Sequence, residues 1–144
     1  MEASPLEAVK ERAKALLKNH PEVRFAFLFG SAVLGRTTPL SDVDLAVYVS
    51  DLSPSRDIRS ELTSELMGAL KRNDVDLVLL NSAPPLLRHR ILTQGECLLV
   101  RDPLEEQRFF VRTLQEYFDT APLRSIQARH LSDYLRKLQS SKDN

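Results

Sequence analysis

The chain has 144 residues, which suffice for one domain with a substantial core and are too few for two full domains. Its 20 basic and 20 acidic residues cancel, so it lacks the broad positive surface expected of a nucleic-acid polymerase. The N-terminal residues are acidic and amphipathic, neither basic nor long and apolar, which predicts a cytoplasmic protein without a membrane segment.

The N-terminal segment predicts a helix from Ser4 to about Asn19. Ser4 is the expected N-cap, Pro5 takes the first helical position, and Glu7 completes a capping box. Apolar residues recur at helical spacing along one face, namely Leu6, Val9, Ala13, Leu16 and Leu17. This helix is therefore expected to pack on a sheet rather than to carry chemistry.

Two apolar runs, Phe25 to Phe29 and Val43 to Val49, predict buried strands joined by a loop that opens on Gly30-Ser31. Gly30 has no side chain, so the backbone can turn sharply there and approach an anion closely. Ser31 supplies a hydroxyl and an N–H at an expected helix start. Gly30 and Ser31 are therefore predicted to form a cradle for phosphate groups.

Asp42 and Asp44 lie two positions apart at the start of the second predicted strand. Both carboxylates therefore leave the same face, where they can hold hard cations through oxygen ligands. The alternating residues are expected to face the core: Val43, Leu45, Val47 and Val49. The plainer interpretation is a glycine turn followed by an aspartate that caps a strand. It is disfavoured because carboxylates are seldom placed inside apolar runs without a partner.

A second helix is expected to start at Ser53-Pro54 and to reach about Arg72, with an apolar face and a charged outer face that suggests no role. Asn73-Asp74 then makes a turn, and Val75 to Leu80 reads as a third strand that contains Asp76.

Asp76 is the preferred third acid. An ionised aspartate inside an apolar run is costly unless something compensates its charge, and a metal shared with Asp42 and Asp44 would do so. Asp74 is the alternative, because it shares the strand face with Asp76. It lies at the turn, however, where an aspartate is expected for local hydrogen bonding alone.

The chain then predicts a short helix from Leu86 to Thr93 that ends at Gly95, and a fourth strand from Glu96 to Arg101. Cys97, the single cysteine, lies in an apolar run and is expected to be a reduced, buried thiol.

Two amphipathic helices are expected after residue 101. The first starts at Asp102-Pro103, and the second follows a break at Ala121-Pro122. Phe109 and Phe110 are adjacent, so they point about 100° apart on a helix, and both can be buried only beneath a broad cover. Part of that cover is expected to come from a partner protein.

The spacing of Gly30-Ser31, ten residues and then Asp42-x-Asp44 resembles the nucleotidyltransferase superfamily related to DNA polymerase β. It is most similar to the minimal nucleotidyltransferase (MNT) antitoxins of HEPN/MNT toxin–antitoxin systems, and the likeness runs from Ser4 to about Arg101. The resemblance implies an α+β fold with a mixed sheet packed by helices. Residues 1–101 would form the nucleotidyltransferase core, and residues 102–144 a C-terminal helical extension of the same domain.

The resemblance also implies a reaction. AMP would be transferred from ATP to a tyrosine hydroxyl of a partner HEPN ribonuclease toxin, which silences the toxin in a hetero-oligomeric complex without direct contact to nucleic acid. Two Mg²⁺ ions would be held by Asp42, Asp44 and Asp76, of which Asp76 would also accept the proton of the attacking hydroxyl. Gly30 and Ser31 would hold the β- and γ-phosphates.

Relatives often carry a basic residue just before the second loop glycine, where this chain has Leu34. Arg36 is the loop cation that can reach a bound triphosphate, and the alternative is an arginine that is only solvated.

Two other functions stay open from the sequence. The chain could be a non-catalytic antitoxin that neutralises its partner by binding alone, or a nucleotidyltransferase that modifies a small molecule. All three acids are present, which favours catalysis over binding alone.

Overall fold

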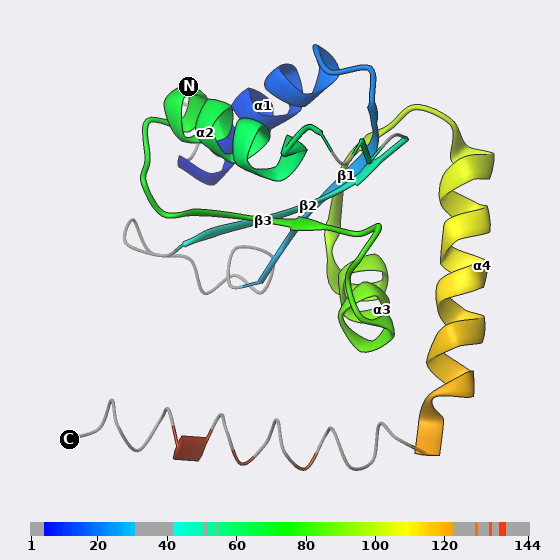
Figure 1. Cartoon of the computed structure of the whole chain (residues 1–144). Helices are drawn as coiled ribbons and strands as arrows, with labels where there is room; N and C mark the ends of the chain where they lie inside the picture. Colours follow the sequence, from blue (N-terminus) through cyan, green and yellow to red (C-terminus); the bar gives the residue numbers. More distant parts are fainter. Residues whose placement is uncertain are drawn as a thin grey trace.

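Four strands form one mixed sheet with helices on both faces (Figure 1). The protein is described here from a computed structural model, which describes residues 5–30, 42–50, 52–53, 55–122, 129, 133 and 136–137. In chain order the elements are α1 (Pro5–Lys18), β1 (Val23–Phe29), β2 (Val43–Val49), α2 (Ile58–Leu70), β3 (Val75–Leu79), α3 (Pro85–Gln94), β4 (Glu96–Val100) and α4 (Pro103–Asp119). This arrangement confirms the predicted α+β class and mixed sheet.

The strand order is β3-β2-β1-β4, so β3 and β4 are the edges. β1 pairs antiparallel with both β2 and β4, whereas β2 and β3 run parallel. Parallel neighbours need a crossover connection, and α2 supplies it between these two strands. In the resulting register Asp44 lies opposite Asp76 on one side and opposite Phe29 on the other.

The core face of β2 is the predicted one. Val43, Leu45 and Val47 are buried together with the apolar faces of α1 and α2, which cover this side of the sheet (Figure 1). The helical face predicted for α2 is also present, with buried side chains at Ile58, Leu62, Leu66 and Leu70. The alternate residues of β2, starting with Asp44, therefore point to the opposite face.

That opposite face is covered by α3 and α4. Its core is formed by Phe25, Phe27, Ala46, Leu80, Ile91 and Phe109. Phe109 comes from α4, is 2% exposed, and packs with ring centroids 5.5 Å from Phe25 and 4.8 Å from Tyr48. Of the two adjacent aromatic residues, Phe109 therefore needs no cover from a partner, because the sheet itself buries this ring.

The predicted start of the second helix at Ser53-Pro54 is also wrong, because α2 begins at Ile58. Asp57 is its N-cap and accepts hydrogen bonds from the backbone N–H of Ser60 at 3.1 Å and from the Ser60 hydroxyl at 2.8 Å. An aspartate satisfies the free N–H groups of a first turn well.

The other predicted elements agree with the structure to within about two residues. Cys97 is an exception in its environment, since it is exposed and not buried. It lies on the edge strand β4, next to a register shift in the β1–β4 pairing. Ser4 and most of the last predicted helix lie outside the described residues. Within the described ranges, no helix is long and apolar enough to span a membrane.

Phe109→Ala is expected to lower the free energy of unfolding by about 3–5 kcal/mol, because it removes a buried aromatic ring from the core. Phe118→Ala lies on the same helix at a side chain that is 66% exposed, and should change the free energy by less than about 0.5 kcal/mol. Urea denaturation followed by circular dichroism measures both. Equal effects of the two substitutions would contradict the packing of α4.

Candidate active site

Parallel pairing of β2 with β3 brings two of the predicted acids together. Asp44 and Asp76 are direct register partners, and neighbouring strands lie about 4.8 Å apart. Both residues belong to the strand positions that alternate with the buried valines and leucines, so both carboxylates leave the face opposite α1 and α2. Asp44 is half-buried and Asp76 is exposed.

Asp42 immediately precedes β2, two residues before Asp44, and is exposed. The backbone there is tied to β3, because the Val43 N–H donates to the Asp74 carbonyl at 2.9 Å. The three predicted acids therefore lie at the start of two neighbouring strands. Ser31, Arg36 and the rest of the loop at residues 31–41 lie outside the described residues.

Gly30 lies at the end of β1, beside Asp44. It follows Phe29, the register partner of Asp44, and has a φ of +77°, a conformation that residues with a Cβ rarely adopt. A Cβ at this position would also collide with the Asp44 carboxylate oxygen Oδ2. The glycine is therefore required both for the turn and for the space that the Asp44 side chain occupies.

The charge of Asp44 is destabilised in the folded chain. Burial raises the pKa of Asp44 above its ordinary value of 3.8, and the nearby carboxylates of Asp76 and Asp42 raise it further. This is the pattern of like charges gathered around a half-buried group. A bound cation would relieve it.

Asp74, the alternative third acid, already has a different partner. Arg72 donates to its two carboxylate oxygens, from Nε to Oδ1 at 2.7 Å and from Nη2 to Oδ2 at 2.6 Å. This side-chain hydrogen bonding is the main reason that the pKa of Asp74 lies below its ordinary value. The geometry favours Asp76 as the third acid, because Asp74 is satisfied locally, as expected for an aspartate at a turn.

Arg59 is a neighbour of the site that the sequence analysis did not single out. It belongs to the first turn of α2, and its Nε donates to the Leu77 carbonyl on the edge strand β3 at 2.9 Å. Its Nη2 lies 3.9 Å from Asp76 Oδ1, so a cation from one face of the sheet reaches an acid on the other around the edge. The sequence gives no signal for this contact with Asp76, because Arg59 looks like any other charged residue near the start of a helix.

The donor set fits a hard cation. Asp42, Asp44 and Asp76 offer carboxylate oxygens, which are the ligands that Mg²⁺ prefers, and the raised pKa of Asp44 records the charge crowding that a cation would neutralise. Within the described ranges, however, no three His, Cys, Asp or Glu side chains are already gathered closely enough to hold a metal ion. The ligand set thus stays a prediction.

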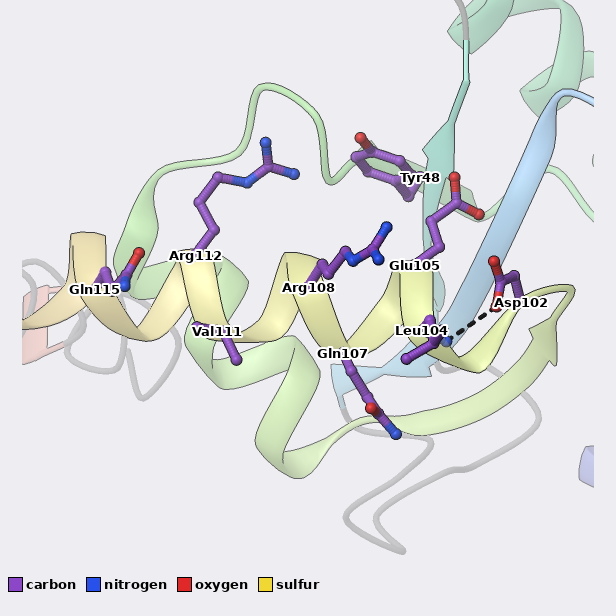
Figure 2. A pocket seen from close by; sticks show the side chains of 9 residues that line it. All are labelled: Tyr48, Asp102, Leu104, Glu105, Gln107, Arg108, Val111, Arg112 and Gln115. Atoms are coloured by element: carbon purple, nitrogen blue, oxygen red, sulfur yellow. Dashed lines mark hydrogen bonds between the residues drawn. The ribbon is translucent and has the colours of Figure 1, made fainter.

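An open concavity of about 710 Å³ lies away from these acids, along α4. Figure 2 shows the side chains that line it, which come from residues 102–115 together with Tyr48 at the far end of β2. Arg108, Arg112 and Glu105 point to the side of Tyr48, whereas Gln107 and Val111 point to the other side. This surface contains none of the predicted catalytic residues.

The family model for polymerase β nucleotidyltransferases matches residues 11–104, which include the whole sheet and the three acids. The chain belongs to the polymerase β nucleotidyltransferase family. This confirms the resemblance seen in the spacing of Gly30, Asp42 and Asp44.

Individual relatives show which members of this family the chain is similar to. The nucleotidyltransferase is 36% identical to the protein adenylyltransferase MntA of Shewanella oneidensis over 104 residues, which are 72% of this chain and 73% of that protein. It is also similar to a chain in a solved toxin–antitoxin complex with AMP-PNP, at 31% identity and a TM-score of 0.68, over 88% of this chain and 98% of the other.

A second solved complex contains the tri-AMPylated HEPN toxin of Shewanella oneidensis with its MNT antitoxin. The similarity there is 29% identity with a TM-score of 0.62, and it covers 92% of this chain and 99% of the other. The present chain is thus a homologue of antitoxin adenylyltransferases along most of its length.

Asp44→Asn is expected to stabilise the metal-free nucleotidyltransferase at pH 7. Because the pKa of Asp44 is raised in the folded chain, its contribution to stability is complete below the unfolded value of 3.8 and is lost as the pH rises through the folded value. The advantage of the variant should therefore be present at neutral pH and should shrink below about pH 4. Urea denaturation in EDTA at both pH values measures it.

The matched control is Glu11→Gln, which removes one exposed carboxylate of α1 far from the site. It should not reproduce the pH-dependent gain. An Asp44→Asn variant that is less stable than the wild type at pH 7 would contradict the charge crowding.

Proposed function

We propose that this nucleotidyltransferase transfers AMP from ATP to a tyrosine hydroxyl of a HEPN-domain partner and thereby neutralises that partner as a toxin. The observation that carries the proposal is the pairing of Asp44 with Asp76 beside Gly30, in a chain homologous to a protein adenylyltransferase. The solved relatives with AMP-PNP and with an AMPylated HEPN toxin support the nucleotide and the class of acceptor.

The chain's own residues suggest how the nucleotide is held. Gly30 lets the backbone turn beside Asp44 without a side chain, so phosphate oxygens can approach the backbone closely. Gly30 and Ser31 are the residues proposed to bind the β- and γ-phosphates. Asp42, Asp44 and Asp76 would hold Mg²⁺, which neutralises the triphosphate and the pyrophosphate that leaves.

The transfer itself needs a base. The tyrosine oxygen forms a bond to the α-phosphorus of ATP, while the bond from that phosphorus to the pyrophosphate oxygen breaks. Asp76 is proposed to accept the hydroxyl proton. Its carboxylate is exposed at the edge strand and so is accessible to an acceptor presented by another protein, whereas Asp44 lies deeper.

Two alternatives make different predictions. A chain that acts by binding alone would neutralise the partner without ATP, and a small-molecule nucleotidyltransferase would leave the partner's mass unchanged. Neither has a specific observation in its favour, whereas the homology to a protein adenylyltransferase favours a protein acceptor.

The first test is intact-mass spectrometry of a HEPN-domain protein from the same source, after incubation with this chain, ATP and Mg²⁺. The wild type should add one or more AMP groups, and peptide mapping should locate them on tyrosine. A variant with both Asp42→Asn and Asp44→Asn should reduce transfer to the level seen without enzyme, because it removes the two acids that share one strand face.

The double variant should remain folded, with a thermal midpoint in metal-free buffer at or above that of the wild type. If it transfers AMP at close to the wild-type rate, the two aspartates do not carry the reaction. If the wild type leaves the partner unmodified but suppresses its ribonuclease activity, binding alone is the function.

The two candidate third acids are separated by single substitutions. Asp76→Asn should lower kcat about 100-fold or more, with little change in ATP affinity, because Asp42 and Asp44 still contact the nucleotide's metal. Asp74→Asn should be nearly neutral for transfer and should lower the stability slightly, because it breaks the pair with Arg72. Single-turnover kinetics and urea denaturation measure these effects, and the reverse ranking would assign the third acid to Asp74.

A further inference from the structure

We infer that the outer face of α4 is the docking surface for an amphipathic helix of the partner protein, with acidic side chains along one border of that helix. The inference rests on the proposed function, in which the acceptor is a protein. It adds the surface that recognises the acceptor, which is separate from the acids that carry the chemistry.

Three large apolar side chains form the centre of this surface, which we call the α4 stripe. They are Leu104, Val111 and Phe118, with exposed fractions of 57%, 52% and 66%. The spacing of seven residues is two helical turns to within about 20°, so the three side chains lie on one line along the helix. Such a seven-residue apolar repeat is what one helix presents to another.

The packing of α4 fixes this line outward. Phe109 and Thr113 are the buried side chains of α4, and they lie on the face opposite the stripe. Arg88 of α3 secures the same inner face, because its Nη1 donates to Glu116 Oε2 at 2.7 Å and its guanidinium lies over the Phe109 ring. The α4 stripe is therefore not a core face that the helix could turn inward.

The border of the stripe on the Tyr48 side is basic. Arg108 and Arg112 project there (Figure 2), and no carboxylate of the described residues lies within ion-pair distance of either guanidinium. The Arg112 guanidinium also lies over the Phe109 ring, 5.5 Å from its centroid, so Arg108 is the less engaged of the two. Two nearby acids are already engaged, since Glu105 accepts from Arg24 at 2.8 Å and Asp102 caps the helix at the Leu104 N–H. The exposed Asp119 lies one heptad after Arg112, so the basic part of the border is the segment from Arg108 to Arg112. A partner helix with acidic side chains on that border would supply the missing charge.

Charge also argues against a second copy of this chain as the occupant. In an antiparallel pair of α4 helices centred on Val111, the arginine borders of both copies would lie on the same side. Arg108 and Arg112 of each copy would then approach their counterparts with no acid between them, and like charges across an interface disfavour that pairing.

The test uses the full chain with Val111→Glu and, separately, Phe118→Glu. Each should weaken binding to the HEPN-domain partner at least about 30-fold in isothermal titration calorimetry, because a charge would replace a buried interface anchor. The matched control is Leu52→Glu, an exposed leucine outside α4 that is 46% exposed, which should bind as the wild type does. Wild-type binding by both α4 variants would overturn the inference.

The charged border is tested by Arg108→Glu, which should weaken binding about five-fold at low salt, mainly by slowing association. Arg12→Glu, an exposed charge reversal on α1, is its control. If Arg108→Glu binds like the wild type at low salt, the partner helix has no acidic border and this part of the inference is wrong.

Three further outcomes would overturn the docking surface. The isolated wild type could be a dimer that Val111→Glu dissociates, or both α4 variants could lose several degrees of thermal midpoint because residues 123–144 cover the stripe. The wild type could also fail to bind the partner. AMP transfer, measured in parallel, separates this inference from the proposed function. If the wild type binds the partner tightly but transfers no AMP, the proposed function is wrong and the docking surface is not affected. If both α4 variants bind with wild-type affinity and transfer AMP, the docking surface is wrong and the proposed function is not affected.

Discussion

The parallel pairing of β2 with β3 is the constraint on which the site depends. It places Asp44 directly beside Asp76, although 32 positions separate them in the chain, and α2 exists as the crossover that makes this pairing possible. Gathering these carboxylates destabilises the charged form of Asp44, as its raised pKa shows. A fold that gathers carboxylates in this way gains nothing in stability from them, so their presence points to a task that needs a concentrated negative charge.

Much of the fold could be predicted because the apolar patterns are strong. The alternation of β2 indicates which residues are buried, and an aspartate that interrupts an apolar alternation is visible without a structure. The choice between Asp74 and Asp76 was harder. Both share a strand face, and only the pair of Asp74 with Arg72 and the register of Asp76 with Asp44 separate them physically.

Other errors have local causes. Ser53-Pro54 and Asp57 are both good helix starts, and the sequence contains no measure of which one the chain uses. A partner was expected to supply part of the cover over Phe109 and Phe110, whereas Phe25 and Tyr48 of the same chain pack against the Phe109 ring. Which side of an amphipathic helix meets the sheet depends on side chains far away in sequence. The contact of Arg59 with the edge of β3 likewise joins residues far apart in the sequence, so no local pattern predicts it.

One strand connects the acids with α4. Tyr48 lies four residues after Asp44 on the same face of β2, and its ring packs 4.8 Å from that of Phe109. A helix anchored at this ring is fixed relative to β2, the strand that contains Asp44, so a protein bound on α4 would be held in a defined position relative to this acid. Rigid positioning of this kind is what brings a hydroxyl of another protein into line with a phosphate.

The edge position of β3 has a consequence for solubility. An edge strand offers unpaired backbone groups to any other extended chain, and proteins commonly protect such edges with charge. In β3 the exposed Asp76 interrupts an otherwise apolar strand, and Arg59 occupies the Leu77 carbonyl that a foreign strand would need. The same charged pair at the mouth of the site thus also discourages the sheet from growing by self-association.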